Sequence, residues 1–128
     1  MDPEAVEGLL NRAAGAMELA LAQCSGFRVG SALLAAGGRV YTGCNIENPS
    51  LMLTLCAERV ALYKAISEGA RSFEAIAIVC SEDRPCAPCG PCRQALHEFA
   101  PGIQVYLRSS AGVVKYTEAE LLPNPFDR

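Results

Sequence analysis

The stretch Pro88-Cys89-Gly-Pro-Cys92 places two cysteines three positions apart, directly before a helix predicted over residues 91–99. Gly90 and Pro91 supply the bend that a pair of thiolates needs to bind one zinc ion, and proline suits the first position of a helix. Both thiolates then lie at a helix N-terminus, where the helix dipole favours negative charge. The stretch therefore predicts one part of a metal site.

A third cysteine stands upstream in Cys56-Ala-Glu58-Arg59, where Thr54 is expected to cap a helix that runs to about Glu68. Cys56 then lies in the first turn of that helix. Glu58 follows two positions later, and in mid-helix this spacing would point the two side chains to opposite sides. Both side chains can reach the same metal centre only at the N-terminal end of a helix. The pattern therefore predicts that this pair lies at the helix end.

Three thiolates and a nearby carboxylate are the components of a catalytic zinc site. Cys56, Cys89 and Cys92 supply three ligands and leave a fourth position open for water, while Glu58 remains free to carry protons. Zinc nucleobase deaminases have this order: a Cys or His, then a non-ligand Glu two residues later, then Pro-Cys-x-x-Cys downstream. The spacing and the order of residues favour this chemistry.

Cys86 allows two other interpretations of the cysteines. With Cys56, Cys89 and Cys92 it could close a four-cysteine structural zinc site, and the chain would then be a zinc-stabilised binding module. The spacing also resembles an iron–sulfur ligand run, but Leu96 occupies the position where that run needs its fourth cysteine. A catalytic centre is favoured because a closed zinc site leaves the nearby carboxylate without a purpose.

The hydrophobic pattern along the chain predicts the element order α-β-β-α-β-α-β-β-α. Two helical crossovers imply parallel neighbours in the middle of a sheet, and two hairpins imply antiparallel pairs outside. The predicted fold is α/β, a three-layer α-β-α arrangement with a mixed five-stranded sheet, formed by one domain of residues 1–128. The predicted helices cover residues 3–22, 54–68, 91–99 and 118–122, and the predicted strands cover residues 27–35, 39–44, 74–80, 103–107 and 113–116.

Composition and charge restrict the partners. The chain carries a net charge of −3, and no stretch concentrates Lys and Arg as a nucleic-acid-binding stripe would. No signal, transit or transmembrane segment is apparent, so we expect a cytoplasmic protein whose thiols stay reduced. A small-molecule substrate is therefore favoured over nucleic acid polymers and membranes. The chain has seven cysteines and one histidine, His97, for which a surface or packing role is favoured over metal binding.

The chain resembles the small, homotetrameric type of cytidine deaminase over nearly its whole length. The segments that carry the resemblance are Phe27-Arg-Val-Gly30, Gly43-Cys-Asn45-Ile-Glu47-Asn48, Cys56-Ala-Glu58-Arg59, Lys64-Ala-Ile-Ser-Glu-Gly69, Pro88-Cys89-Gly-Pro-Cys92-Arg93-Gln94 and Glu120-Leu-Leu-Pro123. The resemblance implies hydrolytic deamination of cytidine or deoxycytidine to the uridine form plus ammonia, in pyrimidine salvage, with one Zn²⁺ per subunit. It also implies a cytidine deaminase-like fold and a homotetramer whose sites are shared between subunits.

The resemblance assigns the parts of the zinc site. The pair Arg93-Gln94 sets the register, which makes Cys56, Cys89 and Cys92 the ligands and leaves Cys86 as a spare thiol. Glu58 is the expected catalytic residue. It would take a proton from water, pass it to the ring nitrogen beside the reacting carbon, and then deliver a proton to the departing amine.

The resemblance also assigns the substrate contacts. The residues expected to bind substrate are Asn45 and Glu47 at the ribose hydroxyls, Phe27 and the backbone of Ala57 at the base, and Phe126 in a neighbouring subunit's site. Without the resemblance, Asn45 and Glu47 would be interpreted as turn residues at a strand end. Phe27 would be a core strand residue, and Phe126 would be a tail residue.

Several positions depart from the family pattern. Gln23-Cys24-Ser25 stands where the family usually has Pro-Tyr-Ser. Leu51 stands where the family usually has a tyrosine, which removes one polar contact near the ribose or between subunits. Pro49 is also unusual at its position. These departures concern substrate detail, because the zinc ligands and Glu58 are intact.

Arg59 is expected to tune the charge of the zinc centre. One zinc ion with three thiolates has a net charge of −1, which makes the metal a poorer Lewis acid than zinc bound by neutral histidines. Two helix N-termini offset part of this charge. Arg59 is the expected donor to a thiolate, and the alternative is that it faces solvent on its helix.

A deaminase of another nucleoside-like substrate could use the same zinc centre. A nucleoside antibiotic and guanine are two such substrates. The pair Asn45-x-Glu47 favours a nucleoside with free ribose hydroxyls. The sequence therefore predicts cytidine or deoxycytidine first.

Overall fold

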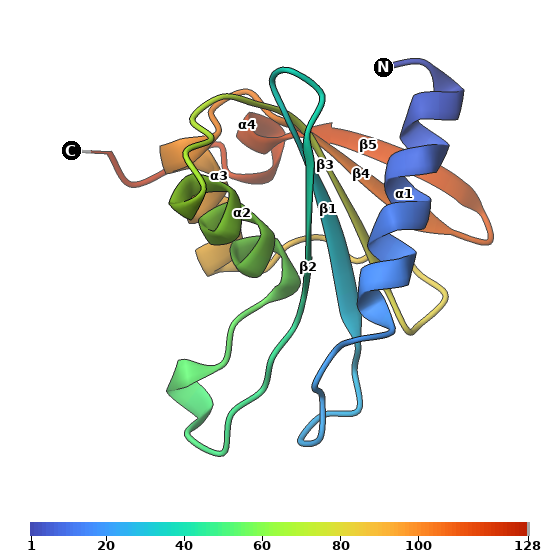
Figure 1. Ribbon diagram of the computed structural model, residues 1–128, viewed down its shortest axis with the longest axis vertical. Helices are drawn as coiled ribbons and strands as arrows, with labels where there is room; N and C mark the ends of the chain where they lie inside the picture. The colour runs from blue at the N-terminus through green and yellow to red at the C-terminus, as the bar shows by residue number, and fades with distance from the viewer. Residues whose placement is uncertain (128) are drawn as a thin grey trace.

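Five strands form one mixed sheet in the computed structural model, which describes residues 1–127 (Figure 1). Across the sheet the strands are β2 (Val40–Cys44), β1 (Val29–Ala35), β3 (Phe73–Cys80), β4 (Gln104–Ser109) and β5 (Gly112–Thr117). The helices are α1 (Pro3–Met17), α2 (Ala57–Ser67), α3 (Gly90–Phe99) and α4 (Glu118–Leu121), with a 3₁₀ turn, η1, at Leu51–Leu53. The predicted domain of residues 1–128 ends at Arg128, which lies outside the described residues.

The strand directions correct one sequence prediction. β3 and β4 are parallel, as expected, but β1 pairs with β3 in an antiparallel arrangement. The helical crossover through α2 runs from β2 to β3, and β1 lies between those two strands. A crossover makes two strands parallel without making them neighbours. Only one of the two expected parallel pairs is therefore present among residues 1–127.

The first hairpin contains the predicted Gly-Gly pair within a slightly longer loop. The Ala35 N–H donates to the Arg39 carbonyl at 2.9 Å and the Gly38 N–H donates to the Ala35 carbonyl at 3.1 Å, so the loop consists of residues 36–38. Gly37 and Gly38 have φ angles of 94° and 96°, which glycine adopts without strain. The turn sets the register in which Leu33 pairs with Tyr41. The hairpin therefore brings the polar segment after β2 to the same end of the sheet as the start of β1.

The two faces of the sheet pack against different helices (Figure 1). Successive side chains of a strand point to opposite faces. Ala32 of β1 packs with Leu9 and Leu10 of α1, whereas its neighbour Leu33 packs with α2 and α3 side chains on the other face. The three-layer α-β-α prediction is confirmed.

Gly43 allows helix α2 to lie directly on the first hairpin. A Cβ atom at Gly43 would lie 2.4 Å from the carbonyl oxygen of Ala57 and 2.7 Å from the backbone nitrogen of Ala61. Only a residue without a side chain permits this approach. On the paired strand, the buried Ser31 hydroxyl donates a hydrogen bond of 2.8 Å to the same Ala57 oxygen. Both strands therefore fix the first turn of α2 at the sheet.

Helix α1 is shorter than predicted: it ends at Met17, and the chain beyond its cap pairs with the segment after β2. Leu21 donates its N–H to the Asn45 carbonyl at 3.0 Å and accepts a hydrogen bond from the Glu47 N–H at 2.8 Å. Residues 18–22 thus run beside the segment that follows β2. Within residues 1–127, no helix is long and apolar enough to cross a membrane.

Candidate active site

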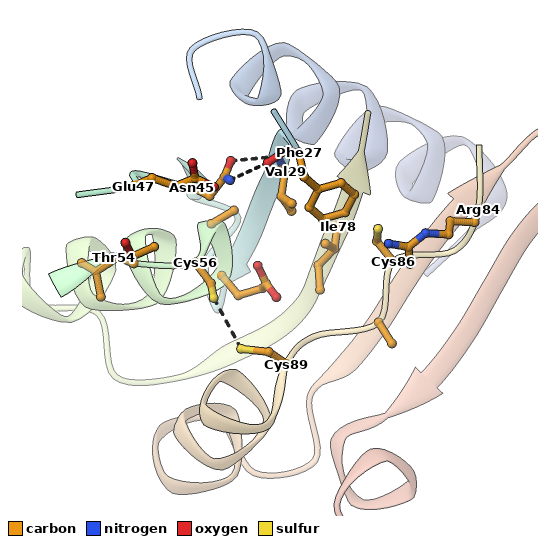
Figure 2. Close-up of a pocket in the computed structure, with 14 residues that line it drawn as sticks. Phe27, Val29, Asn45, Glu47, Thr54, Cys56, Ile78, Arg84, Cys86 and Cys89 are labelled. Carbon is orange, nitrogen blue, oxygen red and sulfur yellow. Dashed lines mark hydrogen bonds between the residues drawn. The ribbon is translucent and has the colours of Figure 1, made fainter. Parts of the chain in front are cut away.

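A cavity of about 240 Å³ opens at the end of the sheet where α2 and α3 begin (Figure 2). Two helix N-termini therefore face it, and both favour negative charge. The residues that line it are Phe27, Val29, Asn45, Glu47, Thr54, Leu55, Cys56, Ala57, Glu58, Ile78, Arg84, Cys86, Ala87 and Cys89. Apolar walls with a few polar groups are typical of a small-molecule site.

Three cysteine sulfurs form a cluster at this cavity. The Sγ atoms of Cys56, Cys89 and Cys92 all lie within 4.8 Å of one another, and those of Cys56 and Cys89 are 3.4 Å apart. Cys56 is the N-cap residue of α2, Cys89 is the N-cap residue of α3, and Cys92 is buried in the first turn of α3. The structure thus brings together the three cysteines predicted as metal ligands. Three clustered thiolate donors fit Zn²⁺.

Thr54 does not cap α2, which corrects the predicted start of this helix. The helix begins at Ala57, and the Thr54 hydroxyl accepts a hydrogen bond from the Asn48 N–H at 3.1 Å. Cys56 thus stands one step outside the helix rather than in its first turn. The prediction that Cys56 and Glu58 lie together at the helix end still holds, because both residues line the cavity from the N-terminus of α2.

Cys86 lies outside the three-cysteine cluster. It forms a disulfide bond with Cys80 at the end of β3, and the two Cα atoms are 6.2 Å apart. The expectations that Cys86 is a spare thiol and that the thiols stay reduced are therefore wrong for this pair. A four-cysteine closed site is also excluded in this structure, because the fourth sulfur is already bonded.

The three clustered thiols have very different proton affinities. The pKa of Cys56 is lowered to about 5, first by its hydrogen bond with Cys92 and further by Arg59, against the effect of burial. The same hydrogen bond, followed by burial, raises the pKa of Cys92, and burial raises the pKa of Cys89. One thiolate thus forms readily without metal. A cation that binds all three sulfurs must displace the remaining thiol protons.

Glu58 is a buried carboxylate, and one of its oxygens makes no hydrogen bond within the described residues. Its side chain is 4% exposed, and its Oε1 has no hydrogen-bond partner within the described residues. Burial raises the pKa of Glu58 to about 7. A buried polar atom without a partner is costly and is common at functional sites. This oxygen is suited to accept a proton or a hydrogen bond from a molecule in the cavity.

Arg59 reaches back to the cysteine cluster from the first turn of α2. Its Nη2 lies 3.6 Å from Cys56 Sγ, and its Nε is buried without a hydrogen-bond partner among residues 1–127. The guanidinium therefore faces a sulfur rather than solvent. This is the position that charge tuning of the thiolates requires.

Asn45 lies in the cavity wall, but its side chain already holds the backbone (Figure 2). Its Oδ1 accepts from the Val29 N–H at 2.9 Å, and its Nδ2 donates to the Phe27 carbonyl at 2.8 Å. Asn45 thus fixes the segment that carries the Phe27 ring. A ribose hydroxyl would have to share these amide groups.

Glu47 binds the segment in which the sequence departs from the family pattern. Its carboxylate accepts hydrogen bonds from the Cys24 N–H at 2.9 Å, the Ser25 N–H at 3.0 Å and the Ser25 hydroxyl. The hydroxyl and then the N–H of Ser25 hold the pKa of Glu47 below its usual value. This pairing could not be predicted from the sequence, because it joins two loops whose residues are 22 positions apart in the chain.

Phe126 does not line the cavity of its own chain. Its N–H donates to Gln94 Oε1 at 3.3 Å, its carbonyl accepts from Gln94 Nε2 at 2.9 Å, and its ring is exposed. The neighbouring His97 contacts Asp127 at 2.7 Å and Glu118 at 3.5 Å, outside the cysteine cluster. The C-terminal segment is therefore attached to α3 with an aromatic ring facing outward.

Some lining residues were not predicted as part of a site. Leu55, Ile78, Arg84 and Ala87 complete the wall, together with Thr54, which was expected only as a helix cap. Arg84 precedes the cysteine run by only two positions in the sequence, which is the one signal that could have indicated it.

Comparisons with known proteins agree with this geometry. The profile of the family described as "Cytidine and deoxycytidylate deaminase zinc-binding region" matches residues 3–107. A cytidine deaminase from Sporosarcina psychrophila is 46% identical over 125 residues, which cover 96% of this chain and 92% of the relative. A blasticidin-S deaminase from Bacillus cereus is 32% identical over 108 residues, or 78% of this chain and 77% of the relative.

A solved structure supports the fold. The cytidine deaminase from Burkholderia pseudomallei superposes with a TM-score of 0.90 at 41% sequence identity, covering 98% of this chain and 100% of that chain. The predicted architecture is thus the one found in this relative.

Proposed function

The chain belongs to the cytidine and deoxycytidylate deaminase family, and we propose that it hydrolyses cytidine and deoxycytidine to uridine and deoxyuridine with release of ammonia. One observation carries the proposal. A buried carboxylate with a free oxygen, Glu58, shares a cavity with a three-cysteine cluster, and both occupy the spacing of the zinc nucleobase deaminases.

Cys56, Cys89 and Cys92 would hold one Zn²⁺ per chain. Their sulfurs are clustered, Cys56 and Cys89 stand at helix N-cap positions, and Cys86, the other cysteine of the run, is bonded to Cys80. When bound, zinc supplies the Lewis acidity that makes water a nucleophile near neutral pH. Arg59 places positive charge beside Cys56 and would offset the charge of the thiolates.

Glu58 would move the protons of the reaction. In the metal-free protein burial raises the pKa of Glu58 to about 7, and a carboxylate that holds protons this readily suits proton exchange with a substrate. The first transfer would go to the ring nitrogen beside the reacting carbon, and the second to the departing amine. Glu58 has an unpartnered oxygen in the cavity for this exchange.

Phe27, Asn45, Glu47 and Ala57 would hold the nucleoside. Phe27 and Ala57 line the same cavity as Glu58. An aromatic ring and a backbone N–H at these positions suit a pyrimidine base. Ala57 is the first residue of α2, so its N–H has no partner within the helix. Asn45 and Glu47 supply amide and carboxylate groups that suit ribose hydroxyls.

A nucleoside antibiotic is the second candidate substrate. The similarity to a blasticidin-S deaminase favours it over other cytosine compounds. Asn45 and Glu47 argue for free ribose hydroxyls, so we expect cytidine to be preferred. Turnover of each compound at equal concentration distinguishes the two functions.

We also propose a homotetramer with shared sites, located in the cytoplasm and acting in pyrimidine salvage. Exposed apolar side chains support self-association, since Leu51, Met52 and Leu53 are 70%, 93% and 62% exposed. The outward Phe126 ring, 67% exposed, would then enter a neighbouring subunit's site. Analytical ultracentrifugation measures the number of subunits in the assembly. If Phe126 enters a neighbouring site, Phe126→Ala should raise the KM for cytidine. A monomer with an unaffected KM contradicts this part.

The proposed function is tested by the loss of cytidine absorbance with purified protein. We expect about one zinc per chain and turnover of both cytidine and deoxycytidine. The variant Cys89→Ser should lose zinc and turnover together, whereas Cys24→Ser, which changes an exposed cysteine outside the cluster, should keep both. Zinc-loaded protein that leaves cytidine intact would contradict the proposal.

A further inference from the structure

The loop between Cys80 and Cys86 forms one wall of the cavity. The disulfide bond closes the loop at its ends, and two of its residues, Arg84 and Cys86, line the cavity (Figure 2). A closed loop of this size has few conformations. The disulfide therefore restricts where Arg84 can lie.

Two further contacts attach this loop to the rest of the fold. Ser81 donates its N–H to the Arg28 carbonyl at 2.9 Å, and the Arg28 N–H donates to the Ser81 hydroxyl at 3.0 Å. Asp83 accepts the N–H of Ser110, in the turn between β4 and β5, at 2.7 Å. The first pair joins the loop to the residue that follows Phe27.

Arg84 points from this loop toward Phe27 (Figure 2). The Cζ atom of Arg84 lies 5.2 Å from the centroid of the Phe27 ring, and its Nε donates to Glu82 Oε1 at 2.7 Å. A guanidinium at this distance is attracted to the face of an aromatic ring. Among the described residues that line the cavity, Arg84 is the only basic one.

The backbone of Phe27 is already fixed, so the orientation of its ring is the remaining freedom. Its N–H donates to the Ser25 hydroxyl at 3.0 Å, and its carbonyl accepts from Asn45 Nδ2 at 2.8 Å. Rotation of the ring about its side-chain bonds breaks neither contact. Arg84, held by Glu82, opposes that rotation.

We propose that Arg84 is a positioning residue that holds the Phe27 ring in the cavity wall and thereby sets the affinity for the pyrimidine base. This inference rests on the proposed function. Arg84 acts through Phe27 and does not join the three-cysteine cluster or contact Glu58. It therefore affects binding of substrate and transition state alike, which changes KM and leaves kcat nearly constant.

The chain contains a matched control for this contact. Arg39 has its Cζ atom 5.0 Å from the centroid of the Tyr41 ring and donates to Glu68 at 2.9 Å. It makes the same two kinds of interaction as Arg84 and does not line the cavity. Arg39→Gln thus removes a guanidinium–ring contact and an ion pair without changing the site.

The test compares steady-state kinetics on cytidine. Arg84→Gln should raise KM about 2- to 5-fold with kcat within about twofold of wild type, the range expected for one exposed cation–aromatic contact. Arg84→Lys should restore most of the affinity, and Arg39→Gln should leave both parameters unchanged. In a Phe27→Leu background, Arg84→Gln should have no further effect on KM, because its ring partner is gone.

Three results would overturn the proposal: an unchanged KM in Arg84→Gln, a fall in kcat alone, or the same KM change in the Phe27→Leu background. Equilibrium binding of uridine, the expected product, to wild type and Arg84→Gln gives the same comparison without turnover. If the wild-type protein does not act on cytidine, the proposed function fails and this inference falls with it. Turnover by wild type with no Arg84 effect rejects this inference alone.

Discussion

The guanidinium of Arg59 faces Cys56, with Nη2 3.6 Å from Sγ. The start of α2 thus supplies one sulfur of the three-cysteine cluster, the cation beside it and the buried Glu58 between them in sequence. A positive charge at this sulfur lowers the pKa of Cys56 and would reduce the excess negative charge of a three-thiolate zinc centre.

Arg59→Gln should therefore weaken zinc binding and change the pH dependence of turnover. Outer-shell partners typically change metal affinity about 10- to 100-fold, and we expect a loss in this range together with a pH–rate profile displaced to higher pH. Competition with a chelator measures the affinity. Arg71→Gln, which changes an arginine that donates to the Ile66 and Ala70 carbonyls away from the cysteine cluster, is the control. Full zinc content and unchanged turnover across pH in Arg59→Gln would show that the charge is not needed.

Gly43→Ala should damage both stability and the site. The added Cβ would meet the Ala57 oxygen at 2.4 Å, so α2 must move away from the hairpin with Cys56 and Glu58 at its end. Overpacking of this kind costs about 1–3 kcal/mol. Gly8→Ala on α1 meets nothing within 4 Å and should be neutral or stabilising. Urea unfolding and turnover of the two variants give the comparison, and equal stability would contradict the packing argument.

The metal-free protein should become less stable as pH rises, because of Glu58. Its folded pKa is about 7 against a usual value of 4.5, so the folded state binds more protons than the unfolded state between these values. The loss of folding stability that Glu58 causes begins above pH 4.5 and grows as pH rises through about 7. By then the free energy of unfolding is lower by about 3 kcal/mol than at low pH.

Metal-free Glu58→Gln should consequently gain stability relative to wild type as pH rises from 4 to 8. Glu74→Gln, at an exposed strand position, should show no such pH-dependent gain. Urea unfolding at several pH values measures both variants. If the free energy of unfolding of Glu58→Gln differed from that of wild type by the same amount at all pH values, ionisation of the buried carboxylate would not destabilise the folded protein.

His97 should titrate above its usual value. The hydrogen bond with Asp127, followed by the charges of Asp127 and Glu118, raises the pKa of His97. The contact with the C-terminal segment is thus strongest at low pH and is lost as pH rises through the folded pKa. His97 is the single histidine of the chain, so its NMR signals are unambiguous. Asp127→Asn should lower its pKa, and an unaltered titration would contradict the contact.

The metal site could be predicted from sequence because its parts are local. Cys89 and Cys92 are joined by a Gly-Pro bend, and Cys56 and Glu58 share one helix end, so short-range geometry brings each pair together. The three layers were also predictable, since apolar residues at helical spacing predict the helices and short apolar runs bounded by Gly and Pro predict the strands.

The contacts between loops could not be predicted in the same way. Crossover connections fix strand direction but not strand neighbours, so the antiparallel pairing of β1 with β3 was missed. The disulfide between Cys80 and Cys86 was missed because the expected compartment predicted reduced thiols, and the sequence does not show that one loop brings these two sulfurs together. The pairing of Glu47 with Ser25 and of Arg84 with Phe27 depends on tertiary folding alone.

The most direct test of the whole account is the turnover of cytidine by zinc-loaded Glu58→Gln, with zinc counted per chain. Glutamine keeps the size and burial of the side chain but cannot exchange the proton. We predict about one zinc per chain and a loss of kcat of at least about 10²- to 10⁴-fold relative to wild type. Near-normal turnover by zinc-loaded Glu58→Gln would contradict the assignment of this buried carboxylate as the proton carrier.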